Sequence, residues 1–130
     1  MGWSERVRVL SRDSCRTVLV VDDDRDIRDA LCELLRDEGY VAVAAANGEE
    51  ALAYLGAHEP PSVILLDLMM PIMDGWEFRR IQQSDPALAS IPVVVITAAG
   101  DQPARSIQVD RILHKPLQFD HVLDALQAHR

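Results

Sequence analysis

The sequence predicts a single α/β domain, built on a parallel sheet with helices on both faces. Apolar runs typical of strands alternate with helical patterns five times along the chain, as right-handed strand–helix–strand crossovers require. Two runs, at residues 63–66 and 93–96, are continuous rather than alternating, which is typical of strands buried on both faces of a parallel sheet. With 130 residues, of which 48% are hydrophobic, the chain is long enough to bury one such core.

Charge and cysteine content narrow the class of protein. The formal net charge of −8 argues against binding nucleic acid or an anionic membrane surface through charge alone. No apolar run reaches the length of a membrane span, which is about 18 residues. Cys15 and Cys32 have no metal-ligand spacing and support no disulfide framework. We therefore expect a cytoplasmic protein, as a monomer or a weak dimer.

The first 16 residues differ from the rest of the chain. Residues 1–16 mix four arginines with valine and leucine, show no clear period and lack the apolar core of a signal peptide. We expect a tail over residues 1–16 and the domain over residues 17–130. A basic contact arm and a start-site extension are the alternatives for the tail.

The first part of the domain reads as two strand–helix pairs. A β-branched strand over residues 17–21 precedes three aspartates, and apolar residues then recur at helical spacing until Gly39, which is expected to end the helix. A second strand covers residues 41–45. Asn47 can cap the next helix, which has glutamates in its first turn, where the helix dipole favours them.

Two further strands end in polar side chains. The strand over residues 63–66 runs into Asp67, and an Asp-Gly pair at residues 74–75 opens the third helix. The strand over residues 93–96 stops at Thr97. Both are buried strands by pattern, so these polar residues mark their carboxyl ends.

The last part of the domain is less regular. Residues 98–108 contain a glycine and a proline and have room for a short helix at most. A poorer strand over residues 109–113 leads to Lys115. A final amphipathic helix is expected from the apolar spacing that starts at Phe119.

The strand ends gather residues that suit phosphoryl chemistry. Because parallel strands end at one edge of the sheet, and ligands bind at that edge, five side chains should meet there: Asp22, Asp23, Asp67, Thr97 and Lys115. Three carboxylates repel one another unless a cation intervenes, and oxygen ligands of this kind suit Mg²⁺. The metal, the ammonium and the hydroxyl could neutralise or hold an anionic group while a carboxylate attacks phosphorus.

Each of these residues has a simpler interpretation. The three consecutive aspartates could be a helix N-cap cluster, which we expect for Asp24. Asp67 could be a loop acid, Thr97 could merely end a strand, and Lys115 could be a solvated lysine. Their joint occurrence at the ends of the expected strands favours a site.

In these residues the chain resembles the receiver domain of two-component response regulators. Five segments in order carry the resemblance, which spans about residues 17–129: Val20-Val21-Asp22-Asp23, Leu66-Asp67 with Met70-Pro71, Asp74-Gly75, Ile96-Thr97-Ala98 and Lys115-Pro116. The resemblance implies a flavodoxin-like (βα)5 fold with strand order 2-1-3-4-5. It also implies a signalling switch, rather than an enzyme with a separate substrate, that a sensor histidine kinase or a histidine phosphotransfer protein phosphorylates.

The resemblance also implies residue roles. Asp67 would be the phosphoacceptor. Asp23 and Asp67 would ligate Mg²⁺ together with the backbone carbonyl of Met69, and Asp22 would assist, largely through water. Thr97 would bind the phosphoryl group and move on activation, and Lys115 would pair with the phosphoryl oxygens.

The chain departs from the family pattern in three places. Ile112 stands at the switch position, where the family usually carries a tyrosine or phenylalanine whose ring moves with Thr97. The segment between Thr97 and Lys115 is a few residues short, so the fourth helix is expected to be shortened or irregular. Met69 and Ala99 cannot position an attacking water by hydrogen bonding, so we expect no unusually fast self-dephosphorylation.

Other functions remain open from the sequence. The main alternative is a vestigial receiver that acts as a phosphorylation-independent interaction module, which Ile112 and the short fourth segment motivate. A hydrolase that uses an aspartyl-phosphate would carry a second aspartate where Met69 stands. DNA binding is disfavoured by the charge. The downstream partner, and whether the chain stands alone, are open.

Overall fold

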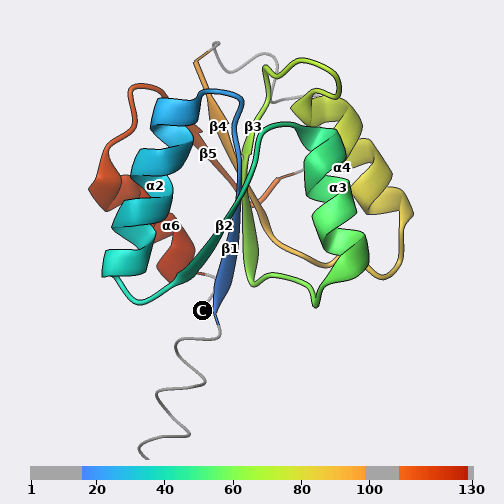
Figure 1. Ribbon diagram of the computed structural model, residues 1–130, viewed down its shortest axis with the longest axis horizontal. Helices are drawn as coiled ribbons and strands as arrows, with labels where there is room; N and C mark the ends of the chain where they lie inside the picture. Colours follow the sequence, from blue (N-terminus) through green and yellow to red (C-terminus); the bar gives the residue numbers. More distant parts are fainter. Residues whose placement is uncertain (1–15, 99–108, 129–130) are drawn as a thin grey trace, which may run out of the picture.

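The computed structural model describes residues 16–98 and 109–128. Its five parallel strands form one sheet in the order β2-β1-β3-β4-β5, as expected (Figure 1). The strands are β1 (Thr17–Val21), β2 (Val41–Ala45), β3 (Val63–Asp67), β4 (Val93–Thr97) and β5 (Arg111–His114). The described helices are α2 (Arg25–Asp37), α3 (Gly48–Ala57), α4 (Gly75–Ser84) and α6 (Phe119–Gln127). The predicted fold class is confirmed.

Two parts of the prediction lie outside the described residues. They are the tail, apart from Arg16, and the shortened or irregular fourth helix expected within residues 98–108, of which Ala98 alone is described. The fifth strand is described, and it begins at Arg111 rather than at Val109. Asp110 explains the later start. Its carboxylate accepts from the Val93 N–H, so a side chain rather than the backbone pairs with the first N–H of β4. Its own N–H donates to the Val93 carbonyl.

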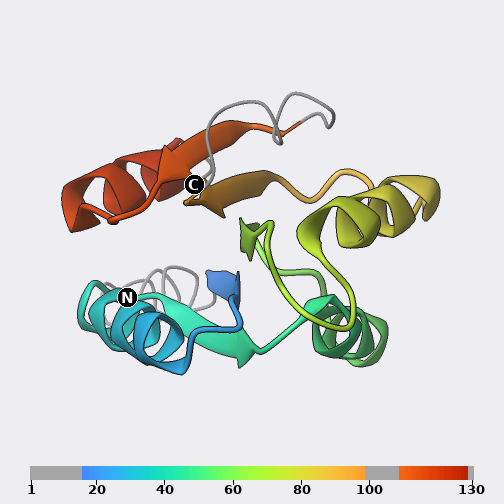
Figure 2. The ribbon, with the colours of Figure 1, turned by 90° about the horizontal axis from the view of Figure 1, so that it is seen from above.

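The sheet has an apolar cluster on each face. Within β1, Val18 and Val20 pack into the cluster under α2 and α6, whereas Leu19 and Val21 pack into the cluster under α3 and α4. This alternation follows the pleat of the strand. Figure 2 looks onto the carboxyl ends of the strands and shows the two pairs of helices on opposite sides of the sheet. Each fully buried aliphatic side chain contributes roughly 1.5–3 kcal/mol, so the central strands are firmly held.

The strand register brings polar residues to one edge. Asp67 pairs with Ile96, and Thr97 pairs with His114, so the carboxyl ends of β3, β4 and β5 are level. Asp22 follows β1 directly, and its backbone N–H extends the ladder to the Ala45 carbonyl at 3.1 Å. The edge predicted to carry the site therefore holds these residues on neighbouring strands.

Side chains cap the helices that begin close to this edge. Asp24 is the N-cap of α2 and accepts from the N–H groups of Asp26 and Ile27. Asn47 caps α3 and accepts from the Glu50 N–H, as predicted. Gly39, with φ of 92°, follows the end of α2 in the left-handed conformation that glycine adopts readily. Asp24 thus serves the helix, and this confirms the capping interpretation for that aspartate.

The turn after β3 leaves no room for a side chain at Gly75. The Gly75 N–H donates to the Leu68 carbonyl at 2.9 Å. A Cβ at this position would lie 2.7 Å from the Asp67 carbonyl oxygen and 2.7 Å from the Leu68 Cα. Because both of these atoms belong to the backbone, they cannot swing aside. The first turn of α4 therefore rests directly on the backbone that carries Asp67.

We predict that Gly75→Ala lowers the free energy of unfolding by about 1–3 kcal/mol, the usual cost of overpacking. Gly56→Ala is the matched control, because a Cβ at Gly56, inside α3, meets nothing within 4 Å. Removing a helical glycine should stabilise the protein by about 0.5–1 kcal/mol. Urea unfolding of both variants measures the difference. A Gly75→Ala protein as stable as the Gly56→Ala protein would contradict the packing described here.

Candidate functional site

Three carboxylates meet at the carboxyl edge of the sheet. Oxygens of Asp22, Asp23 and Asp67 all lie within 4.8 Å of one another. Asp22 is 1% exposed and Asp67 is 2% exposed, whereas Asp23 is exposed. The strand ends place them: Asp22 and Asp23 follow β1, and Asp67 is the last residue of β3. The structure therefore brings together the three acids that the sequence predicted at this edge.

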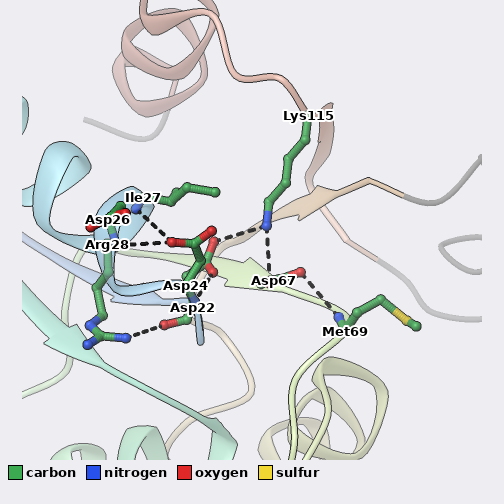
Figure 3. A network of polar contacts seen from close by, with 8 residues as sticks. All are labelled: Asp22, Asp24, Asp26, Ile27, Arg28, Asp67, Met69 and Lys115. Atoms are coloured by element: carbon green, nitrogen blue, oxygen red, sulfur yellow. Dashed lines mark hydrogen bonds and ion pairs between the residues drawn. The ribbon is translucent and has the colours of Figure 1, made fainter.

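Lys115 bridges two of these carboxylates. Its ammonium Nζ lies 3.3 Å from Asp67 Oδ2 and 3.4 Å from Asp22 Oδ2 (Figure 3). The Lys115 N–H donates to the Thr97 carbonyl at 3.0 Å, and this bond continues the β4–β5 pairing beyond the strand. The side chain of Lys115 is 19% exposed, so the two ion pairs are sheltered from water. The predicted lysine is thus part of the site, held by the end of β4.

Backbone N–H groups orient the two buried carboxylates. Asp67 Oδ1 accepts from the Met69 N–H at 3.2 Å, and Asp22 Oδ1 accepts from the Asp24 N–H at 2.8 Å. These bonds leave both Oδ2 atoms facing Lys115 (Figure 3). Asp22 Oδ2 is fully buried and accepts no hydrogen bond from the described residues. Its contact with Lys115 is an ion pair. With respect to the described residues, this oxygen therefore keeps acceptor capacity for a further ligand.

Burial and neighbouring charges shift the pKa values of Asp67 and Lys115. Burial, and then the charge of Asp22, raise the pKa of Asp67 to about 6, and these effects outweigh Lys115 and the Met69 N–H. Burial alone would lower the pKa of Lys115, but Asp22 and Asp67 outweigh it, so the pKa of this lysine is raised. The ammonium is therefore firmly charged, yet one lysine does not neutralise three carboxylates.

The donor set fits Mg²⁺. All three acids offer hard oxygen ligands, and Mg²⁺ is commonly held by one or two carboxylates while it keeps several waters. Asp22 Oδ2, a buried carboxylate oxygen that accepts no hydrogen bond from the described part of the chain, adds acceptor capacity beside the exposed Asp23. A divalent cation would also relieve the repulsion that raises the pKa of Asp67.

Two of the other predicted site residues, Thr97 and Met69, adjoin this pocket. Thr97 is fully buried at the end of β4, next along the chain from Ile96, which pairs with Asp67. Met69 contributes its N–H to Asp67, and this residue is 58% exposed beside the pocket. Ile112, the predicted switch residue, is half-buried on β5 and packs against the apolar cluster under α3 and α4.

Arg28 takes part in the site although the sequence did not single it out. Its guanidinium Nη1 donates to the backbone carbonyl of Asp22 at 2.8 Å (Figure 3). Arg28 lies one turn into α2, four residues after the cap Asp24. That spacing is the signal that could have identified it, because a long side chain one turn after an N-cap can reach back to the preceding loop.

An apolar groove adjoins the pocket. It encloses about 290 Å³ between α2 and α6, and its walls include Ile27, Leu31, Leu34, Leu117 and Phe119. Lys115 lines the same groove, so the groove reaches the edge of the acidic pocket.

In the part of the chain that the structure describes, every helix is too short or too polar to cross a membrane.

Comparisons with known proteins agree with this geometry. The family model described as "Response regulator receiver domain" matches residues 18–127. PilG of Pseudomonas aeruginosa is 31% identical over 116 residues, which cover 86% of this chain and 85% of that protein. Sporulation initiation phosphotransferase F of Bacillus subtilis is 36% identical over 117 residues, covering 86% of this chain and 91% of that protein. The chain spans about half of another relative, response regulator Rre1 of Synechocystis, since 48% of that protein is covered.

Solved structures with the same fold include two informative ones. Chemotaxis protein CheY4 of Vibrio cholerae superposes with a TM-score of 0.81 at 30% identity, over 89% of this chain and 99% of that chain. Response regulator TrrA of Thermotoga maritima, in complex with Mg²⁺ and BeF, gives a TM-score of 0.77 at 28% identity, over 88% of this chain and 99% of that chain. The family match over most of the chain, together with these similarities, shows that the chain belongs to the response regulator receiver domain family.

Proposed function

We propose that this chain is a phosphorylation-dependent signalling switch that accepts a phosphoryl group on Asp67. The observation that carries the proposal is the buried Asp67 carboxylate, 3.3 Å from the Lys115 ammonium and grouped with Asp22 and Asp23. The donor would be the phosphohistidine of a sensor histidine kinase or of a histidine phosphotransfer protein. Membership of the receiver family supports this class of donor.

The proposed reaction is a direct transfer between two side chains. An Asp67 oxygen forms a bond to phosphorus while the donor's N–P bond breaks and its electron pair stays on the imidazole. With a pKa of about 6, Asp67 is mostly ionised near neutral pH and available as a nucleophile. The Met69 N–H holds one carboxylate oxygen, and Lys115 faces the other.

The surrounding residues would stabilise the phosphoryl group. Lys115 would pair with a phosphoryl oxygen, and the Thr97 hydroxyl would hydrogen-bond to another and move as it does so. Asp23, Asp67 and the Met69 carbonyl would hold Mg²⁺, with Asp22 assisting largely through water. The metal would supply positive charge to the phosphoryl oxygens. The related TrrA structure, which is in complex with Mg²⁺ and BeF, supports the choice of metal.

Ile112 would respond to phosphorylation differently from the tyrosine or phenylalanine that the family usually carries at this position. Ile112 packs against the cluster under α3 and α4 and pairs with Val95 across the sheet. It has no ring or hydroxyl to redirect toward the surface. We therefore propose that movement of Thr97 is transmitted by repacking around Ile112, and that the downstream protein recognises a surface other than a rotated ring.

The remaining expectations belong to the same proposal. Residues 17–130 would form the receiver domain, acting in the cytoplasm as a monomer or weak dimer without direct contact to nucleic acid or membrane. It would assist its own phosphorylation and dephosphorylation without a separate substrate. The alternative, a phosphorylation-independent module, finds no support in a pocket that keeps all three acids and the lysine together.

We predict that acetyl phosphate with Mg²⁺ adds one phosphoryl group to the wild-type protein and none to Asp67→Asn, as read by intact mass. Asp74→Asn is the matched control, because Asp74 caps α4 outside the pocket and an asparagine can keep the bond to the Glu77 N–H. This control should be phosphorylated like the wild type. An Asp67→Asn protein that still gains the group would refute the assignment of the acceptor.

We predict that Mg²⁺ raises the melting temperature more at pH 7.5 than at pH 5. In the metal-free fold Asp67 has a pKa of about 6, above its ordinary 3.8, so the fold favours the protonated acid. The contribution that protonated Asp67 makes to the free energy of unfolding is then fully present below about pH 4. It is lost as the pH rises through 6, and it amounts to at most about 3 kcal/mol. Mg²⁺ requires the ionised acid, so protons compete with it at pH 5.

The control for this pH dependence is Asp67→Asn without metal. It removes the ionisable group, so it should melt above the metal-free wild type at pH 7.5, and the difference should shrink toward pH 4. Differential scanning calorimetry at several pH values measures both effects. An equal effect of Mg²⁺ at pH 5 and pH 7.5 would contradict the proposed linkage.

We also propose that the phosphodonor protein docks in the α2–α6 groove. Its histidine must reach Asp67, so it must contact the surface beside the pocket, and this groove is apolar and reaches Lys115. Leu34, 37% exposed in the groove, can be replaced without emptying the core.

We predict that Leu34→Glu slows phosphorylation at least about tenfold when the donor is a phosphorylated histidine phosphotransfer domain, and leaves the acetyl phosphate rate unchanged. Val41→Glu is the control, since Val41 is 43% exposed at the start of β2 and outside the groove. Phosphotransfer profiling against a panel of such domains provides the measurement. Equal transfer to both variants would exclude the groove as the docking site.

A further inference from the structure

We propose that Arg28 is a positioning residue for the acidic pocket: it holds the peptide between Asp22 and Asp23 and so sets the two acids for a divalent cation. The inference deepens the proposed function, because it rests on the pocket's binding Mg²⁺. Arg28 contacts the backbone of Asp22 and not the reacting atoms, so its effect is indirect.

The contacts of Asp22 show what Arg28 adds. The Asp22 N–H is bonded to the Ala45 carbonyl at 3.1 Å, and Asp22 Oδ1 accepts from the Asp24 N–H at 2.8 Å. The Asp22 carbonyl lies beyond the end of β1, and Arg28 Nη1 donates to it at 2.8 Å. Oδ2 is then the atom of Asp22 that stays directed at the pocket (Figure 3).

This bond determines where Asp23 points. The carbonyl of Asp22 belongs to the peptide unit that leads into Asp23, and a planar peptide fixed at its oxygen can no longer rotate freely. Asp23 is exposed and none of the contacts described above holds its side chain. Its place within 4.8 Å of Asp22 and Asp67 therefore depends on the backbone that Arg28 holds.

A restraint is needed because the acids repel one another. Three carboxylates lie within 4.8 Å of one another and Lys115 pairs with two of them, Asp22 and Asp67; in a sheltered site the repulsion between the acids is larger than in water. The segment between β1 and α2 is three residues long and could relieve the repulsion by turning Asp23 outward. Arg28 closes this segment from the helix side, since its own N–H is bonded to the Asp24 carbonyl at 2.9 Å.

Positioning and charge predict opposite effects on metal binding. If Arg28 acted through its positive charge alone, removing it would tighten Mg²⁺ binding, because a nearby cation repels the metal. If it acts by holding the Asp22 carbonyl, removing it should weaken binding, as loss of an outer partner of a metal ligand does. The sign of the change therefore separates the two.

The test compares three variants of the full chain by Mg²⁺ titration calorimetry. Arg28→Met removes the donor and the charge, and Arg28→Lys keeps a charged donor on a long stem. Arg25→Met removes the same charge from the same turn of α2, where the side chain of Arg25 is 83% exposed and paired with Asp29. We expect the Mg²⁺ dissociation constant to rise about tenfold in Arg28→Met. It should stay within about threefold of wild type in Arg28→Lys, and remain unchanged or fall slightly in Arg25→Met.

A second readout works without metal. Amide hydrogen exchange at Asp24, whose N–H is bonded to Asp22 Oδ1, should become about tenfold faster in Arg28→Met. The Glu77 amide, which bonds to the cap Asp74, should not change. Unchanged Asp24 exchange, or Mg²⁺ binding that is unchanged or tighter in Arg28→Met, would overturn the inference. A wild-type protein that binds no Mg²⁺ would instead refute the proposed function, and the Asp24 exchange would still decide whether Arg28 orders the segment.

Discussion

Electrostatic repulsion at the carboxyl edge of the sheet is the constraint on which the rest of the structure depends. Asp22 and Asp67 are buried there with Asp23 beside them, and Lys115 forms ion pairs with Asp22 and with Asp67. This arrangement raises the pKa of Asp67, because burial and a like charge both oppose its ionisation. It also makes the pocket receptive to a divalent cation and to chemistry that brings further charge to it.

The fold can sustain this repulsion because its strands have no freedom to separate. Residues of β3 and β4 are buried throughout, between apolar clusters on the two faces of the sheet. On the other side of Asp67, Gly75 rests on the backbone without space for a Cβ. The acids therefore cannot move apart by shifting strands. Relief must come from ions, from protonation, or from rotation within the short segment after β1.

The sequence predicted the features that depend on pattern and order. Buried strands were recognisable from continuous apolar runs, and a parallel sheet then required Asp22, Asp67 and Thr97 to meet at one edge. The strand order came from the resemblance to receiver domains, and the caps at Asp24 and Asn47 followed from residue type and position.

Features that depend on the reach of individual side chains could not be predicted in this way. Arg28 bonds to a backbone carbonyl six residues earlier, and its place one turn after the cap Asp24 marks it as able to reach the loop without giving its partner. On α4, the polar residues Arg79 and Gln82 are buried, although a helix of this kind is expected to bury apolar side chains. The Gln82 amide donates to the carbonyls of Leu88 and Ile91, and its oxygen accepts from Arg79, so its polar atoms are satisfied within the fold. Such pairing becomes visible once the loop after α4 is placed.

The central claim is that the pocket makes Asp67, and no other acid, the phosphoryl acceptor. The most direct measurement is to phosphorylate the protein and reduce it with borohydride, which converts an aspartyl phosphate into homoserine. Sequencing of the peptides by mass spectrometry then locates the converted residue. The structure predicts homoserine at position 67, with Asp22 and Asp23 unchanged. Homoserine at Asp22 or Asp23, or at an acid outside the pocket, would contradict it.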